Sequence, residues 1–213
     1  MSKTGSIIIA RILAFLILSG GLTGCTVASL VGANSEPPVT HDLLAGSKRG
    51  LGHLDIQLTV NEPSAVEALS SSRIAIKPGP HEISYFANAV WTDKLPRLLQ
   101  LRLVESFENG RILNAVSAGN DRIRGDFGLS LEIRDFQVEV NNGSAQAHVR
   151  LYVKLVDEDK GVLVSAREFS AFSHAKNDSV DAGVDALKEA FSGVSVKIMR
   201  WIVSRRVVVT DAG

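Results

Sequence analysis

The sequence predicts an α+β fold. We expect a two-layer sandwich in which two main helices, at about 93–109 and 179–204, lie on one face of a mostly antiparallel sheet. Two observations support this prediction. Segments in which apolar and polar residues alternate, as in half-buried strands, dominate residues 54–172. The two helical segments instead repeat apolar residues every three or four positions. Strands segregated from helices are typical of the α+β class.

The composition indicates a globular chain with no dominant charge. Its 213 residues include 23 Lys+Arg and 23 Asp+Glu, and 45% are hydrophobic. These values argue against a disordered chain and a polytopic membrane protein. Without excess positive charge to neutralise phosphates, no nucleic-acid partner is expected. A single cysteine rules out an intramolecular disulfide and a multi-cysteine zinc site.

Residues 1–24 are typical of a secretory signal. Lys3 and Arg11 are the only charged residues before Cys25, and small residues follow the apolar run. The apolar stretch after Arg11 is shorter than the roughly 20 residues that a transmembrane helix needs. We therefore predict a targeting segment here rather than part of the fold.

The end of this segment, Leu22-Thr23-Gly24-Cys25, resembles the bacterial lipobox. In proteins with that motif, the cysteine thiol receives a diacylglycerol, the signal is cut before it, and the new N-terminus is acylated with a chain such as palmitate. Three acyl chains anchor a protein stably, whereas one binds only marginally. Cys25 is thus the predicted lipidation site. The alternative is an unmodified cysteine at the end of an ordinary signal or anchor helix.

The residue after the cysteine predicts which of the two membranes holds the protein. By resemblance to Gram-negative lipoproteins, an aspartate there would favour the inner membrane. Thr26 therefore favours the outer membrane, with the domain facing the periplasm and the inner membrane as the alternative.

The segment between the anchor and the domain has few periodic apolar residues. Residues 25–52 contain several glycines and Pro37-Pro38, so we predict a lipidated N-terminus and flexible tether. The domain is expected over 53–204. Its first elements are expected to be strands at 54–60 and 73–77, a helical turn within 62–70 and a short edge segment at 83–87.

The first helix is predicted at 93–109. Asp93 is a candidate cap, and Pro96 falls in the first turn, where a missing N–H costs little. Its apolar stripe is Leu95, Leu99, Leu103 and Phe107, and a strand is expected at 111–116.

Residues 126–172 predict an antiparallel meander. The apolar phase changes at Arg134-Asp135, which indicates a β-bulge. Asn142-Gly143 is a two-residue hairpin signal. The second helix follows at 179–204, capped by Asp178 or Ser179, and its apolar stripe indicates a core face rather than a coiled-coil seam. Residues 205–213 are predicted to be a loose tail.

Catalytic and metal-binding motifs are scarce. The five histidines form no metal-binding pair motif, and His148 is expected to face solvent in phase with Gln146 and Arg150. No phosphate-binding glycine loop and no G-x-S-x-G motif occurs. We therefore expect no enzyme, no cofactor and no metal, although a triad need not show in sequence order.

One long stretch carries a family resemblance. Residues 85–108, Tyr-Phe-Ala-Asn-Ala-Val-Trp-Thr-Asp-Lys-Leu-Pro-Arg-Leu-Leu-Gln-Leu-Arg-Leu-Val-Glu-Ser-Phe-Glu, resemble the signature of the ABC-type transport auxiliary lipoprotein family, the PqiC-like proteins. Residues 72–76 and 131–136, Trp201 and the lipobox agree with it. The likeness covers roughly residues 54–204.

The resemblance implies a non-enzymatic accessory subunit. Members of the family work with an inner-membrane permease or ABC transporter and with a mammalian-cell-entry (MCE) domain protein that spans the periplasm. Such systems are thought to move phospholipids or other hydrophobic molecules between membranes. A homo-oligomer would match the ring symmetry of MCE proteins. The alternatives are a lipoprotein that regulates cell-envelope synthesis enzymes and a periplasmic hydrolase.

Three aromatic residues of the signature have two interpretations. Tyr85 and Trp91 precede the first helix and could pack beneath it. Alternatively, Tyr85, Phe86 and Trp91 form an exposed patch that binds a partner, since aromatic residues are enriched at interface hot spots. Burial of Trp91 would count against the second interpretation.

Overall fold

The computed structural model describes residues 37–119, 121, 125–141 and 143–205. The signal segment, Cys25 and residues 206–213 lie outside this part of the chain. The described elements are β1 (Val39–His41), β2 (Leu54–Val60), β3 (Ser64–Ala65), the 3-10 turn η1 (Glu67–Leu69), β4 (Arg73–Gly79), β5 (Glu82–Trp91), α2 (Leu95–Gly110), β6 (Leu113–Ala118), β7 (Phe127–Asn141), β8 (Ser144–Asp157), β9 (Val162–His174) and α3 (Val180–Ser204).

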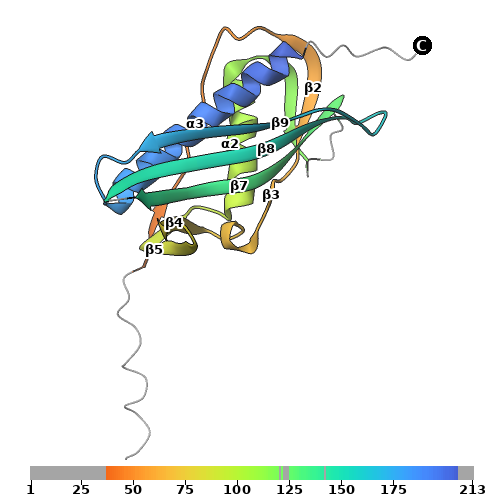
Figure 1. The fold of residues 1–213 in the computed structure, drawn as a ribbon. Coiled ribbons are helices and arrows are strands. Elements are labelled where there is room, and N and C mark those ends of the chain that lie inside the picture. Colours follow the sequence, from red (N-terminus) through yellow and green to blue (C-terminus); the bar gives the residue numbers. More distant parts are fainter. Residues whose placement is uncertain (1–36, 120, 122–124, 142, 206–213) are drawn as a thin grey trace, which may run out of the picture. The chain divides into compact units, whose positions relative to one another are not determined.

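The long strand β7 organises the sheet (Figure 1). One of its edges pairs with β8 along its whole length, and β8 pairs with β9, so the predicted antiparallel meander is confirmed. On its other side β7 pairs in succession with β2, β3 and β4, all in parallel. Strand β5 then joins β4 antiparallel, while β1 joins β5 and β6 joins β2 in parallel.

The sheet is therefore mixed and curled, and the prediction of a mostly antiparallel sheet is wrong in that respect. Apolar alternation reports which face of a strand is buried, but it says nothing about the direction of the neighbouring strand. Parallel neighbours need a crossover connection, which a pattern of single strands does not reveal. The short edge segment expected at 83–87 is instead part of the ten-residue β5, which lies between β1 and β4.

Two local features of the meander confirm the sequence pattern. The register of β7 on β8 shifts between Ile133 and Asp135, so the bulge lies at Arg134. The hairpin closes with Asn141 opposite Ser144. Gly143 in its turn has a φ of +78°, a backbone conformation that favours glycine.

The two helices begin and end within two residues of their predicted bounds. Helix α3 packs on β7, β8 and β9, while α2 packs on β2, β6 and α3 (Figure 1). Ser179 caps α3 by accepting a hydrogen bond from the Ala182 N–H at 3.2 Å. Within the described residues, neither helix is both long and apolar enough to cross a bilayer.

Asp93 does not cap α2 as predicted. The N-cap is Lys94, and Pro96 lies in the first turn. The Asp93 carboxylate accepts from the N–H of its neighbour Lys94 at 2.6 Å. Because Asp93 lies one position before the N-cap, its carboxylate satisfies that amide rather than one inside the helix.

Both predicted apolar stripes lie in the core. All four residues of the α2 stripe are buried. In the α3 stripe Val180 is half-buried against the core, and the rest are buried: Val184, Leu187, Phe191, Val194, Ile198 and Trp201. These side chains join the inward residues of β7 and β8 in one cluster. The stripe of α3 is therefore a core face in this chain, as the spacing indicated.

Residues 38–46 form a strap that belongs to the domain, so the predicted tether is too long at its C-terminal end. Strand β1 pairs with β5, and Leu43 is only 1% exposed. The Gly46 N–H donates to Ser106 Oγ at 2.8 Å, and a Cβ on Gly46 would lie 2.8 Å from Ser195 Cβ. A single buried leucine gives no periodicity, which is why the sequence pattern missed the strap.

The strap is also tied to α2 by charge. The Arg102 guanidinium binds the carboxylates of Asp42 and Glu105. The same Asp42 accepts from Thr92 Oγ at 3.3 Å. These contacts join the strap, the end of β5 and α2 before the chain reaches β2.

Replacing Leu43 with alanine tests whether the strap is structural. We expect Leu43→Ala to lower the free energy of unfolding by about 2–5 kcal/mol, because it empties a buried apolar site. Leu44 is 64% exposed, so Leu44→Ala should change it by less than about 0.5 kcal/mol. Urea denaturation of the two variants measures the difference. Equal, small effects would mean that the strap is a tether after all.

Candidate functional site

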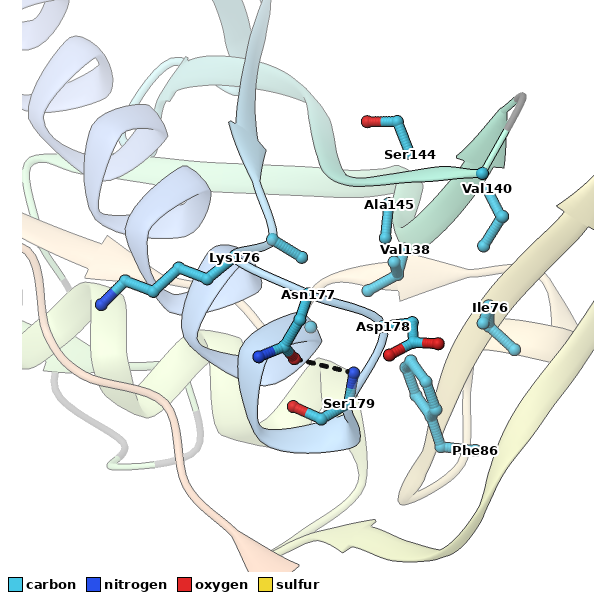
Figure 2. A pocket seen from close by; sticks show the side chains of 13 residues that line it. Ile76, Phe86, Val138, Val140, Ser144, Ala145, Lys176, Asn177, Asp178 and Ser179 are labelled. Atoms are coloured by element: carbon cyan, nitrogen blue, oxygen red, sulfur yellow. Dashed lines mark hydrogen bonds between the residues drawn. The ribbon is translucent and has the colours of Figure 1, made fainter.

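A groove of about 480 Å³ lies where α3 begins (Figure 2). We call it the α3 groove. Strands β4, β5, β7 and β8 provide its apolar wall, and the segment before α3 provides a polar rim. The apolar side chains are Ile76, Phe86, Val138, Val140, Ala145 and Ala175, and the polar ones are Ser144, Lys176, Asn177, Asp178 and Ser179.

Hydrogen bonds fix the rim. The Ala175 N–H donates to the Ala145 carbonyl at 2.9 Å, which holds the segment against the start of β8. Asn177 Oδ1 then accepts from the Ser179 N–H at 3.0 Å (Figure 2). Because Ser179 also caps α3, the rim and the helix start form one ordered unit.

A glycine of α3 makes room for the aromatic side chain of the wall. A Cβ on Gly183 would lie 3.2 Å from Phe86 Cζ and 3.2 Å from Val138 Cγ2. The absence of a side chain there lets the Phe86 ring lie against the helix. An apolar wall with a few polar rim groups suits an apolar chain or an apolar side chain of a partner.

The three signature aromatics do not form one exposed patch. Phe86 lines the α3 groove, and Trp91 is only 2% exposed and packs edge-on against Phe136, with centroids 6.0 Å apart. The Tyr85 ring lies under the Arg73 guanidinium, 3.6 Å from its centroid. Burial of Trp91 favours the packing interpretation for that residue.

Alternation along β5 places the neighbours Tyr85 and Phe86 on opposite faces of the strand. A kink then changes the phase of β5 between Phe86 and Trp91. Asn88 has a φ of +54°. Between the pairs Arg73–Val90 and Ala75–Tyr85, β4 advances by two residues and β5 by five, so β5 bulges there. Such a bulge changes which face the following residues occupy. The aromatic spacing in the sequence therefore does not translate into one face.

A second cluster lies across the meander. His148 was expected to face solvent, but its side chain is only 14% exposed. Its Nδ1 lies 3.0 Å from Glu139 Oε1, its Nε2 lies 3.2 Å from Ser170 Oγ, and the Phe172 ring stacks on it at 4.1 Å. No sequence motif marks this cluster, because its members come from three strands and lie on a diagonal of the register.

The chemistry of this cluster is limited by its surroundings. Glu139, His148 and Ser170 stand in the order of an acid, a base and a hydroxyl nucleophile. Neither Glu139 nor His148 lines the α3 groove or a second groove between β9 and the C-terminal half of α3. Ligand atoms of Asp135, Glu139 and His148 lie within 4.8 Å of one another. Asp135 already binds Arg150 and Lys77, however, and two cations there oppose a third.

Asp135 is a buried carboxylate of the meander that pairs with Arg150 and Lys77. Burial by itself would raise the pKa of its carboxyl group. Hydrogen bonds from Gln137 Nε2 and Arg150, together with the charge of Arg150, outweigh burial and hold that pKa below its ordinary value. The ionised carboxylate therefore stabilises the fold at neutral pH.

Acidification should reveal this contribution. The pKa of Asp135 is lower in the folded than in the unfolded chain, so its stabilisation is present above about pH 4 and is lost as pH falls through the folded value. Asp135→Asn should cost roughly 1–3 kcal/mol at pH 7 and less at low pH. Urea denaturation at several pH values measures this, with the exposed Asp185→Asn as control. Parallel pH profiles for wild type and Asp135→Asn would contradict the assignment.

Comparison with known proteins identifies a relative and a fold. An uncharacterized protein of Bradyrhizobium diazoefficiens is 29% identical over 188 residues, which cover 87% of this chain and 50% of that protein. The chain thus spans about half the length of the curated relative it matches. A Xanthomonas campestris crystal structure, from a family of unknown function, is 21% identical with a TM-score of 0.71, covering 78% of this chain and 95% of that one.

A second crystal structure, of an uncharacterized protein, agrees in fold. It is 18% identical with a TM-score of 0.59, and it covers 78% of this chain and 99% of that one. Both likenesses concern the fold alone. The model of the family described as "ABC-type transport auxiliary lipoprotein component" matches residues 43–199, from the buried Leu43 of the strap to the last turns of α3. This chain therefore belongs to the ABC-type transport auxiliary lipoprotein family.

Proposed function

We propose that this protein is a membrane-anchored, non-enzymatic accessory subunit of an ABC- or MCE-type transport system. Its partners would be an MCE-domain protein and the associated inner-membrane permease or ABC transporter. The cargo would be phospholipids or other hydrophobic molecules moving between the two membranes. The observation that carries this proposal is the family match, which extends over nearly the whole described domain.

The anchor in this proposal is a lipid on Cys25, held in the outer membrane with the domain in the periplasm. The described chain enters the domain through β1, which pairs with β5 beside the α3 groove. His41 at the end of β1 lies 4.0 Å from Asp181 in the first turn of α3. The groove therefore lies at the end of the domain where the described chain begins.

The α3 groove supports a binding role. Its wall is apolar, and its rim residues Asn177 and Ser179 already form hydrogen bonds that order the segment. An apolar part of the cargo, or of a transport partner, would gain about 25 cal/mol for each Å² of apolar surface buried there. This role needs no chemical step.

Lipid traffic between the membranes tests the function. In cells, a pulse-labelled phospholipid should reach the outer-membrane fraction more slowly when the protein is deleted, and wild type should restore the rate. Cys25→Ser and Phe86→Asp should restore it poorly. Ile83→Asp, on the same strand but exposed and outside the α3 groove, is the matched control for Phe86→Asp. Unchanged traffic in the deletion strain would contradict the proposal.

Serine hydrolysis is the second candidate function. The contacts of Ser170, His148 and Glu139 favour it, since a nucleophile, a base and an orienting carboxylate lie within hydrogen-bond reach. A fluorophosphonate probe distinguishes the two candidates. Labelling of wild type but not of Ser170→Ala would favour the hydrolase, and absence of labelling would favour the transport role.

A further inference from the structure

The outer edge of β9 is unpaired in the described structure. Among the described residues β9 pairs only with β8, and Figure 1 shows it as the outer strand of the meander. Val162, Leu163 and Val164 at its start are 55%, 55% and 43% exposed. Proteins usually cover such an apolar edge or shield it with charge, because its backbone can pair with another chain.

A groove of about 490 Å³ continues this edge between β9 and the C-terminal half of α3. We call it the β9 groove. Its floor is aromatic, formed by Phe169 and Trp201, whose rings meet edge-on with centroids 5.5 Å apart. Arg167, Lys197 and Arg200 stand around this floor with exposed side chains.

The charges around the β9 groove are not balanced. In the described part of the chain, no carboxylate forms an ion pair with Arg167, Lys197 or Arg200. The acidic residue of the groove, Glu168, is already held by Arg134 at 2.6 Å and by Arg150 at 3.7 Å. The groove therefore presents three cations beside an apolar floor and an unpaired strand.

Lys197 limits the part of the β9 edge that can pair with another strand. Its Nζ donates to the backbone carbonyl of Ser170 at 2.6 Å, so this carbonyl already has a partner. The edge before it, residues 162–168, combines exposed apolar side chains with Arg167. An added strand would thus run along 162–168 and end at the β9 groove.

We propose that the β9 edge binds an extended acidic segment of a partner protein by strand addition. The backbone of that segment would pair with residues 162–168, its carboxylates would meet the three cations, and one apolar side chain would enter the β9 groove. The proposal rests on the proposed function only in expecting the partner to be a transport component.

Other occupants fit these observations less well. A second copy pairing through its own β9 would bring Arg167, Lys197 and Arg200 of both copies together, and like charges oppose such pairing. An anionic lipid headgroup would use the cations but would leave the unpaired backbone and Val162 to Val164 uncovered. Only an extended acidic chain uses all three features.

Site-specific photocrosslinking in cells tests the proposal. A benzophenone amino acid replaces Leu163 in the full chain, and Leu44, which is also exposed but lies on the strap, is the control position. We expect an ultraviolet-dependent adduct with a partner protein from position 163 only. Mass spectrometry should map it to an extended segment rich in Asp and Glu.

A charge reversal adds a second readout. Arg200→Glu should reduce the adduct roughly tenfold, because an attractive contact becomes repulsive. Lys94→Glu, at the exposed start of α2, should leave the adduct unchanged. An adduct that is insensitive to Arg200→Glu would overturn the proposed charge recognition.

The remaining outcomes distinguish failure of the proposed β9 surface from failure of the proposed function. An adduct to residues 206–213, to a second copy or to lipid, or no adduct at position 163, would overturn the proposal. An adduct to an acidic segment of a protein outside any transport system would support the surface and contradict the proposed function. Capture of an MCE-domain protein without an adduct at position 163 would support the proposed function and contradict the proposed β9 surface.

Discussion

Cys25→Ser, expressed behind a secretory signal that is cleaved without lipidation, is expected to release the protein from membranes into the soluble periplasmic fraction. Three acyl chains bury many methylene groups, each contributing about 0.8 kcal/mol, so their loss removes the predicted anchor. The described residues contain no helix that could replace it. Wild type should sediment with the outer membrane on a density gradient and carry the added mass of the lipid.

A second substitution separates anchoring from sorting. Thr26→Asp should keep the lipid mass but move the protein toward the inner-membrane fraction. An alkaline wash removes peripheral proteins from the membranes. If Cys25→Ser then remained in the membranes at the same level as wild type, lipid would not be the anchor. An unchanged distribution of Thr26→Asp would contradict the sorting prediction alone.

Trp91→Ala should lower the free energy of unfolding by about 3–5 kcal/mol. Trp91 is 2% exposed, and its indole packs edge-on against Phe136. Truncating a buried aromatic side chain leaves a cavity that the surroundings fill only partly. Urea denaturation of the soluble Cys25→Ser form, with and without Trp91→Ala, measures the loss.

The conservative change Trp91→Phe distinguishes packing from partner binding. It keeps an aromatic ring in the core, so we expect a smaller loss of stability and unchanged capture of the partner. If Trp91→Phe unfolded like wild type yet lost its partner, Trp91 would belong to an interface and the packing interpretation would be wrong.

The meander and both helices were predictable because their patterns are local. The hairpin at Gly143, the bulge at Arg134 and the Ser179 cap each depend on a few neighbouring residues. The parallel pairing of β7 with β2, β3 and β4 was not predictable in this way. Strand order depends on crossover connections between distant segments, which alternation does not encode.

The grooves proposed as binding surfaces were predicted only in part. Phe86 was singled out as an aromatic partner contact, and it lines the α3 groove. Alternation along β5 places it on the opposite face from Tyr85, and the kink at Asn88 changes the face on which Trp91 lies. Nothing in the aromatic spacing indicates that kink. The Glu139–His148–Ser170 contacts and the β9 groove depend on the register of β7, β8 and β9 and on the position of α3, so they became visible only in the fold.

The most direct test of the transport account is a pulldown of the anchored, affinity-tagged protein after mild crosslinking in cells. Mass spectrometry reads the captured proteins, and Cys25→Ser serves as the mislocalised control. We expect an MCE-domain protein and its permease or ATPase to be enriched with wild type and depleted with Cys25→Ser. Their absence, with cell-envelope synthesis enzymes enriched instead, would contradict the transport role and favour a regulator of envelope synthesis.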